Sequence, residues 1–212
     1  MSSKSVAIIT MSTRATRIGP SVAEYVKNTI EKPLASAGIS LTPLDVVKFN
    51  LPVFNEHVAP AMVPEKASFV HEHSKVWSAE IAKYDGYVLV IPEYNYGMAG
   101  GTKNAIDYLL NEWKGKPVTI VSYGVKGGNT ANDQVKGALS GCGLVITETR
   151  PTLPFLGGAG PDLYAAMGEG KLGADTLKSW EEEKSEIILK AATELKDLLL
   201  QPNIEANAPK PQ

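Results

Sequence analysis

Three loops of the sequence combine hydroxyl, cationic and glycine residues in a way that suits a bound ligand. The first, "MSTRATRIGP", offers hydroxyl groups at Ser12, Thr13 and Thr16 and forked guanidinium donors at Arg14 and Arg17. A helix is expected to begin directly after it, so unpaired N–H groups and the helix dipole add to these donors. The combination favours a phosphate-binding loop, and the alternative is a solvated basic turn.

The second loop, "PEYNYGMAGG", suits a flat heterocycle with polar edges. Its glycines let the backbone approach a ligand without interference from a Cβ atom. Tyr94 and Tyr96 would supply an aromatic wall, and the consecutive N–H groups around Asn95–Gly97 would meet ring oxygens and nitrogens. The alternative is that the tyrosines pack on the protein and that Gly97, Gly100 and Gly101 only shape the turn.

The third loop, "YGVKGGNT", repeats the glycine pattern at Gly124, Gly127 and Gly128 and adds a positive charge at Lys126. A mobile surface loop is the alternative. Neither G-x-x-x-x-G-K-[ST] nor G-x-G-x-x-G follows the first expected strand, which argues against a P-loop nucleotidase and a Rossmann dinucleotide site. A phosphate site without either motif points to a mononucleotide such as FMN.

Short apolar strands alternating with amphipathic helices must position these loops. Periodicity predicts strands at Ser5–Thr10, Ser40–Val47, Gly86–Pro92, Lys116–Gly124 and Leu144–Arg150. It predicts helices from Gly19 to Gly38, Pro64 to Tyr84, Gly101 to Trp113, Ala131 to Gly143 and Asp175 to Leu200. Asn50–Pro64 and Arg150–Gly173 are interpreted as loops.

This alternation predicts a five-stranded parallel sheet covered by helices on both faces, with strand order 2-1-3-4-5. Pro43 agrees with an edge position for the second strand. In that order the three loops meet at one rim of the sheet, at the carboxyl ends of the first, third and fourth strands. We expect one domain over residues 1–200 and a disordered tail over 201–212.

Composition excludes several other classes of protein. A formal net charge of -2 over 212 residues gives no reason to expect nucleic acid or an anionic membrane as partner. No apolar run approaches the roughly 20 residues that span a bilayer, and the N-terminus lacks a signal-peptide core. Cys142 is the only cysteine and is interpreted as structural, so a reduced, cytoplasmic location is expected. His71 and His73 are expected to point apart on a helix and to bind no metal.

The segment "PEYNYGMAGGTKNAIDYLLNEW" resembles the stretch of the NAD(P)H-dependent FMN reductases that begins P-x-Y-N and ends K-N-A-I-D. "STRATRIGPSVAEYV" and "GKPVTIVSYGVKGG" are similar to the yeast-type NAD(P)H quinone reductases of that family. The resemblance runs from Val6 to about Val145. It implies a flavodoxin-like fold, tightly bound FMN, and a homodimer whose interface helps to build the active site. Met11 occupies a position where many members of the family have glycine. Tyr96 occupies a position that varies within the family.

By position, the resemblance implies that the FMN phosphate is held by Ser12, Arg14, Ile18, Gly19, Pro20 and Ser21. It places the isoalloxazine against Pro92, Glu93, Tyr94, Asn95 and Tyr96 and against Ser122, Tyr123, Gly124, Gly127 and Gly128. Because FMN carries the chemistry, no side-chain nucleophile is expected. Lys126 is a candidate to stabilise negative charge on the reduced ring.

The expected activity is a two-electron, ping-pong reduction of quinones by NADH or NADPH through FMN N5. Azo compounds or free flavin are alternative acceptors at the same site. A flavin-binding electron carrier or redox sensor with incidental turnover is the competing class, although the net charge is far from that of a strongly acidic carrier. We expect neither a nucleic-acid partner nor a membrane span.

Overall fold

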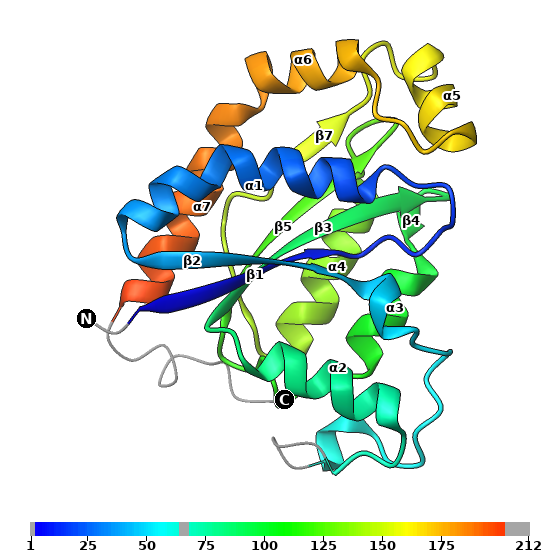
Figure 1. Cartoon of the computed structure of the whole chain (residues 1–212). Helices are drawn as coiled ribbons and strands as arrows, with labels where there is room; N and C mark the ends of the chain where they lie inside the picture. Colours follow the sequence, from blue (N-terminus) through cyan, green and yellow to red (C-terminus); the bar gives the residue numbers. More distant parts are fainter. Residues whose placement is uncertain (1–2, 64–67, 202–212) are drawn as a thin grey trace.

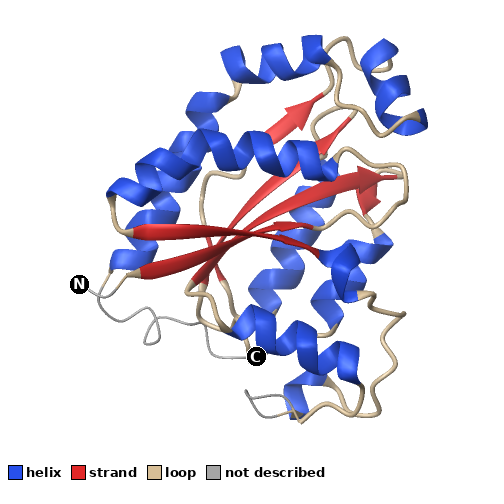
Figure 2. Cartoon of the chain, viewed as in Figure 1, coloured by secondary structure: helices blue, strands red, loops and turns tan. Residues whose placement is uncertain are grey.

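The computed structural model describes residues 3–63 and 68–201 as a twisted sheet between two layers of helices (Figures 1 and 2). The strands that lie side by side run in the order β2-β1-β3-β5-β6. They are β1 (Lys4–Thr10), β2 (Ile39–Asp45), β3 (Gly86–Tyr94), β5 (Pro117–Gly124) and β6 (Val145–Ile146). All four of these pairings are parallel, which confirms the doubly wound arrangement.

Strand residues divide between two apolar cores because successive side chains point to opposite faces of a sheet. Val6 and Ile8 of β1 pack beneath α1 (Gly19–Ser36) and α7 (Ser185–Leu200). Ala7 and Ile9 face the other layer, made by α2 (Glu72–Ala82), α3 (Gly100–Asp107) and α4 (Asn129–Gly141). Burial on both faces explains why the central strands are almost continuously apolar.

The sheet has seven strands, whereas five were predicted. β4 (Gly97–Met98) forms an antiparallel hairpin with β3, and β7 (Thr152–Pro154) pairs with the end of β5. The predicted strand Leu144–Arg150 is wrong beyond Ile146. There Glu194 of α7 accepts hydrogen bonds from the Thr149 backbone N–H (2.7 Å) and hydroxyl (2.5 Å), and these hold the chain off the sheet edge.

The edge position of β2 is confirmed, because β2 pairs with β1 alone and Pro43 lies opposite Ile8. Two short 3-10 helices follow β2, η1 (Val46–Phe49) and η2 (Pro60–Met62).

Several helix boundaries also differ from the predictions. α3 ends at Asp107 rather than Trp113, since the Glu112 carboxylate accepts the Leu110 N–H at 3.0 Å and Trp113 turns into the core. α2 begins only at Glu72; residues 64–67 of its predicted start lie outside the described residues.

The predicted final helix is two helices, α6 (Ala174–Glu183) and α7, which meet at Lys184. Near this break the Tyr25 hydroxyl of α1 donates to the Trp180 carbonyl at 2.7 Å and lies 3.2 Å from the Ser185 hydroxyl. The predicted loop Arg150–Gly173 contains α5 (Pro161–Gly168), which Pro161 opens at a position that needs no N–H. The predicted tail lies outside the described residues from position 202 onward. Among the described helices none is both long and apolar enough to span a membrane.

Candidate functional site

A cavity of about 410 Å³ opens where β1, β3 and β5 end, and we call it the strand-end pocket. The three loops singled out in the sequence meet there, as the strand order requires. Their contributions to its wall are Arg14, Ile18, Glu93, Tyr94, Asn95, Tyr123, Gly124 and Val125. The remaining wall comes from Phe155, directly after β7, and from Leu163, Ala166 and Met167 of α5.

The loop between β1 and α1 is held by its ends and by Arg17, and its backbone donors are left free. Within the described chain, no backbone N–H from Ser12 to Ile18 donates to a protein acceptor. Helix α1 then adds the unpaired N–H groups of its first turn and the positive end of its dipole. Such a run of free donors at a helix N-terminus suits a phosphate.

The two arginines of this loop have different environments. Arg14 is exposed, lies over the Tyr94 ring at 5.2 Å, and donates from Nε to the Thr16 carbonyl at 2.6 Å. Arg17 instead pairs with Asp45 through both terminal nitrogens, at 2.7 Å and 3.1 Å. Only Arg14 therefore offers uncompensated positive charge to the strand-end pocket.

The hairpin between β3 and β4 presents Asn95 and Tyr96 at its tip. Both have positive φ, 49° and 62°, and Tyr94 pairs with Gly97, so the tip has the form of a two-residue type I′ turn. Tyr96 is 86% exposed. Tyr94 is half-buried; burial raises the pKa of its hydroxyl, while Arg14 and Arg17 act in the opposite direction.

A chain of buried hydrogen bonds shapes the turn between β5 and α4. The Ser122 hydroxyl donates to the Gly127 carbonyl at 2.8 Å, and the Asn132 amide donates to the same hydroxyl at 3.1 Å. Gly127 and Gly128 have φ of 90° and 78°, which other residues adopt at a cost. The Glu93 carboxylate accepts the Ala131 N–H at 3.2 Å and so ties this turn to the β3 hairpin.

The Tyr123 hydroxyl is buried and makes no hydrogen bond of normal geometry to the described residues, although the Ser12 hydroxyl lies close enough to affect its pKa. It lies beside Ser12 and Gly19, at the start of α1; a Cβ atom on Gly19 would be 3.0 Å from it. Burial, with a smaller effect of Tyr94, raises the pKa of Tyr123, while the Ser12 hydroxyl and the charges of Arg17 and Arg14 act in the opposite direction, so the hydroxyl remains a proton donor. A buried donor without an acceptor beside an anion-binding loop is the feature expected where a polar ligand group belongs.

The residues predicted to bind FMN separate into three groups. Seven line the strand-end pocket: Arg14, Ile18, Glu93, Tyr94, Asn95, Tyr123 and Gly124. Six are buried behind its wall or in its turns: Ser12, Gly19, Pro92, Ser122, Gly127 and Gly128. Three do not line it: Pro20 and Tyr96 are exposed, and Ser21 faces another groove. Lys126 is exposed as well and outside the lining.

The residues that α5 contributes, and Phe155 after β7, were not among the predicted binding residues. The sequence signal was present in "PDLYAAMG", where Leu163, Ala166 and Met167 recur at helical spacing after a helix-starting proline. The spacing predicts a helix. It does not predict that the helix lies over the pocket, because that position depends on the long connection after β7.

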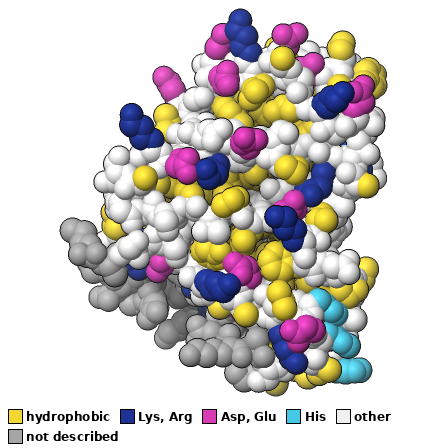
Figure 3. Space-filling view, viewed as in Figure 1, with side chains coloured by type: hydrophobic (Ala, Val, Ile, Leu, Met, Phe, Trp, Pro, Cys, Tyr) yellow, Lys and Arg dark blue, Asp and Glu magenta, His cyan; other side chains and the backbone are white. Residues whose placement is uncertain are grey.

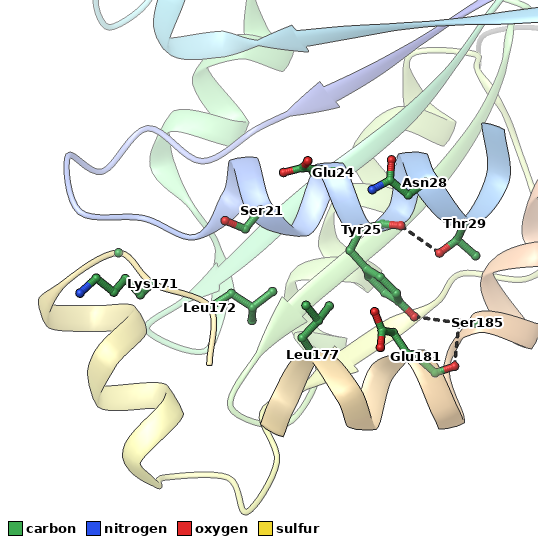
Figure 4. Close-up of a pocket in the computed structure, with 11 residues that line it drawn as sticks. Ser21, Glu24, Tyr25, Asn28, Thr29, Lys171, Leu172, Leu177, Glu181 and Ser185 are labelled. Atoms are coloured by element: carbon green, nitrogen blue, oxygen red, sulfur yellow. Dashed lines mark hydrogen bonds between the residues drawn. The ribbon is translucent and has the colours of Figure 1, made fainter. Parts of the chain in front are cut away.

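A larger groove of about 740 Å³ lies between α1 and α6 (Figure 4). Glu24, Asn28 and Ser21 of α1 border it, opposite Leu177 and Glu181 of α6. The one buried hydroxyl in its lining, that of Tyr25, is already hydrogen-bonded. This groove lacks the buried, unpartnered donor that marks the strand-end pocket.

Other candidate residues lie outside the strand-end pocket. The expectation that His71 and His73 point apart is wrong, because their rings stack at 5.2 Å with 10° between planes. His71 precedes the first residue of α2, so helical spacing does not apply to the pair. Histidine side chains gather on that face (Figure 3), yet the described residues contain no metal-binding group of three ligands. Burial raises the pKa of the Cys142 thiol.

Solved structures share this fold. The flavoenzyme NAD(P)H:(acceptor) oxidoreductase FerB of Paracoccus denitrificans superposes with a TM-score of 0.62 at 21% identity, covering 92% of this chain and 97% of that one. A flavodoxin from the domain Archaea superposes with a TM-score of 0.50 at 12% identity, covering 91% and 99%. The fold is therefore flavodoxin-like, as the sequence resemblance implied.

Comparison of sequences identifies the family. The profile of NADPH-dependent FMN reductase matches residues 5–152. An NAD(P)H-dependent FMN reductase of Nectria sp. is 49% identical over 199 residues, 93% of this chain and 98% of the relative. A Saccharomyces cerevisiae enzyme of the same description is 37% identical over 64% of this chain and 73% of its own length. A 2-hydroxy-1,4-benzoquinone reductase of Burkholderia sp. is 27% identical over 76% and 84%. The chain belongs to the NADPH-dependent FMN reductase family.

Proposed function

We propose that the protein binds FMN in the strand-end pocket and reduces quinones with electrons from NADH or NADPH in a ping-pong reaction. Membership of the family makes the protein an FMN-dependent NAD(P)H oxidoreductase. The observation that supports the placement of FMN is the run of free N–H groups from Ser12 to Ile18 beside Arg14. The resemblance to a named benzoquinone reductase supports the acceptor.

The chain's residues fit FMN at both ends of the strand-end pocket. The β1–α1 loop would hold the phosphate through backbone N–H groups and Arg14. The hairpin tip and the β5–α4 turn would hold the ring, because Tyr94, Asn95 and Gly124 line the pocket on that side. When bound, FMN supplies the two-electron chemistry through N5.

Around the ring, the protein's contribution is positioning and charge. The N–H groups of Val125, Lys126 and Gly128 have no acceptor in the described chain and could face negative charge on the reduced ring. The Phe155, Leu163 and Met167 side chains make the opposite wall apolar, which would limit access of water to a bound ring. We keep Lys126 as a candidate for electrostatic stabilisation. If Lys126→Ala leaves both the flavin midpoint potential and turnover unchanged, that role is refuted.

The exposed apolar residues at the pocket mouth support a homodimer. Val125, Leu156, Tyr164 and Met167 are 40–64% exposed and lie on or beside α5, where hydrophobic side chains gather at the surface (Figures 1 and 3). Exposed apolar side chains that lie together in this way are typical of surfaces that bind another protein. We propose that a second copy covers it and that residues 1–200 form one domain in each copy. Sedimentation at low concentration tests this; a fully active monomer would contradict it. A cytoplasmic location stays a prediction.

The deciding experiment is a visible spectrum of the purified protein before and after anaerobic addition of NADH or NADPH. We expect flavin absorbance, rapid bleaching, and recovery when a benzoquinone is added. Parallel lines in double-reciprocal plots would support ping-pong order. If the protein neither contains FMN nor binds added FMN, the proposal fails. FMN binding with very slow bleaching would favour the electron carrier or redox sensor, and faster reoxidation by azo compounds or free flavin would favour those acceptors.

A further inference from the structure

We propose that Asp45 positions the phosphate-binding loop by holding the Arg17 side chain, and that this side chain supports the loop and does not bind the phosphate. The inference rests on the proposed placement of FMN and adds two residues to it. Neither side chain lines the strand-end pocket, so the role proposed for both side chains is to hold the loop.

The Asp45–Arg17 pair has the geometry of a fixed bidentate clamp. Arg17 Nη2 donates to Asp45 Oδ2 at 2.7 Å, and Nη1 donates to Oδ1 at 3.1 Å. The two side chains are only 13% and 20% exposed, which makes this the most shielded ion pair among the described residues. A planar, shielded pair of this kind holds its geometry far better than an exposed pair.

The clamp acts on the loop through Ser12. Arg17 Nη1 also donates to the Ser12 carbonyl at 3.1 Å and lies 3.4 Å from its hydroxyl. The side chain thereby ties the last residues of the loop to its first and closes it into a ring. Because a peptide unit is planar and trans, fixing the Ser12 carbonyl turns the N–H of Thr13 in the opposite direction. The Arg17 side chain thus sets the direction of the Thr13 N–H and closes the loop without contacting the phosphate.

The carboxylate of Asp45 is itself fixed in place. Asp45 is the last residue of β2 and lies opposite Thr10, the last residue of β1. Its Oδ1 also accepts the Val47 N–H at 3.3 Å, which caps the short 3-10 helix η1. The edge strand therefore supports the phosphate loop from the side. The positive charge of Arg17 is neutralised by Asp45 within the protein. Arg14 is left as the loop's free cation.

The test compares FMN with riboflavin, which lacks the phosphate. Dissociation constants are measured by quenching of flavin fluorescence, without turnover, for wild type, Asp45→Asn, Arg17→Gln and the double variant. We expect each single variant to weaken FMN binding at least about tenfold and riboflavin binding less than about twofold. The double variant is expected to lose no more than the worse single variant, because both changes break the same clamp.

Asp85→Asn is the matched control. Asp85 pairs with Lys4 at 3.2 Å and accepts the Ser5 N–H at 2.8 Å, at the opposite end of the same sheet. We expect its ratio of FMN to riboflavin affinity to equal that of wild type. Asp45→Glu keeps the charge and the fold but displaces the carboxylate by one methylene, and we expect an intermediate loss of FMN selectivity.

Two results would overturn the inference. Asp45→Asn and Asp45→Glu could bind FMN as wild type does, or the variants could lose FMN and riboflavin affinity by the same factor, as a general loss of structure would produce. Failure of the proposed function looks different, because wild type itself would then bind neither flavin. Thermal unfolding of each variant shows whether it is folded at the temperature of the titration.

Discussion

Replacing Tyr123 by phenylalanine should stabilise the FMN-free protein and weaken FMN binding. The Tyr123 hydroxyl is buried without a hydrogen-bond partner of normal geometry in the described part of the chain, at 5% exposure of the residue. An unsatisfied buried hydroxyl costs about 1–3 kcal/mol, so its removal should raise the free energy of unfolding by an amount in that range. For a domain of this length, a gain of about 2 kcal/mol corresponds to an increase of roughly 4–8 °C in Tm.

The same hydroxyl should contribute to FMN affinity because it lies beside Gly19 and Ser12, at the anion-binding end of the strand-end pocket. A hydrogen bond to a charged group contributes about 1.5–3 kcal/mol, so Tyr123→Phe should weaken FMN binding roughly tenfold to a hundredfold. Burial raises the pKa of Tyr123, so the hydroxyl stays protonated and the difference should not change between pH 6 and about pH 9.

Tyr25→Phe is the matched control for Tyr123→Phe. Tyr25 is 7% exposed, but its hydroxyl donates to the Trp180 carbonyl at 2.7 Å and lies 3.2 Å from the Ser185 hydroxyl. Its removal should lower the free energy of unfolding by about 1 kcal/mol, since it deletes a buried hydrogen bond and leaves the Trp180 carbonyl with the Lys184 N–H (2.8 Å) as its remaining donor. Urea unfolding of both FMN-free variants measures the difference. If Tyr123→Phe is destabilised as Tyr25→Phe is, the Tyr123 hydroxyl has a partner and the reasoning is wrong.

Three further predictions follow from single contacts. Tyr96→Gly should raise the free energy of unfolding by about 1 kcal/mol, because Tyr96 has a φ of 62° that glycine adopts without strain; urea unfolding checks it. Asn132→Ala should lower that free energy by about 1–3 kcal/mol, because the buried Asn132 amide joins the Ser122 hydroxyl to Arg150; thermal unfolding checks it. Burial alone would raise the pKa of Asp85, but hydrogen bonds from Ser5 and Lys4 outweigh it and lower the pKa. Its contribution to stability should therefore be complete above about pH 4 and be lost as pH falls through the lowered pKa, as acid unfolding against Asp85→Asn would show.

Each of these has a control in the chain. Tyr164 is 64% exposed inside α5, so Tyr164→Gly should destabilise where Tyr96→Gly stabilises. Asn129→Ala removes an exposed hydrogen bond to the Lys126 carbonyl and should cost less than Asn132→Ala. If the Asp85→Asn variant loses stability in acid as steeply as wild type, protonation of Asp85 does not contribute to acid unfolding.

The parallel core of the fold could be predicted from sequence because its signals are local and strong. Val6–Ile9 and Tyr87–Ile91 are apolar on both faces, and Pro43 marks an edge, so the order of the central strands follows. The errors fall where a tertiary contact overrides a local pattern. Glu194 holds Thr149 off the sheet, and no feature of the segment Leu144–Arg150 announces a partner 45 residues away.

The site could be predicted as a meeting of loops but not as a set of contacts. Arg14, Tyr94 and Gly124 line the strand-end pocket because strand order alone brings their loops together. Ser21 does not, because it lies on the first turn of α1 and faces the groove beside α6. The wall from α5 escaped prediction because a long connection after β7 carries it across the strand ends.

The roles of Arg14 and Arg17 could not be told apart from residue type alone. They are three residues apart in one loop, and either guanidinium could bind a phosphate. Their different environments are set by Asp45, a residue on the edge strand that carries no sign of function in the sequence. A phosphate loop needs free donors and also needs them held in one direction, because a flexible loop would lose entropy on binding. One arginine neutralised by a carboxylate can supply rigidity while the other supplies charge. On this reasoning Arg14→Gln should weaken FMN binding with little change in stability, whereas Arg17→Gln should reduce both.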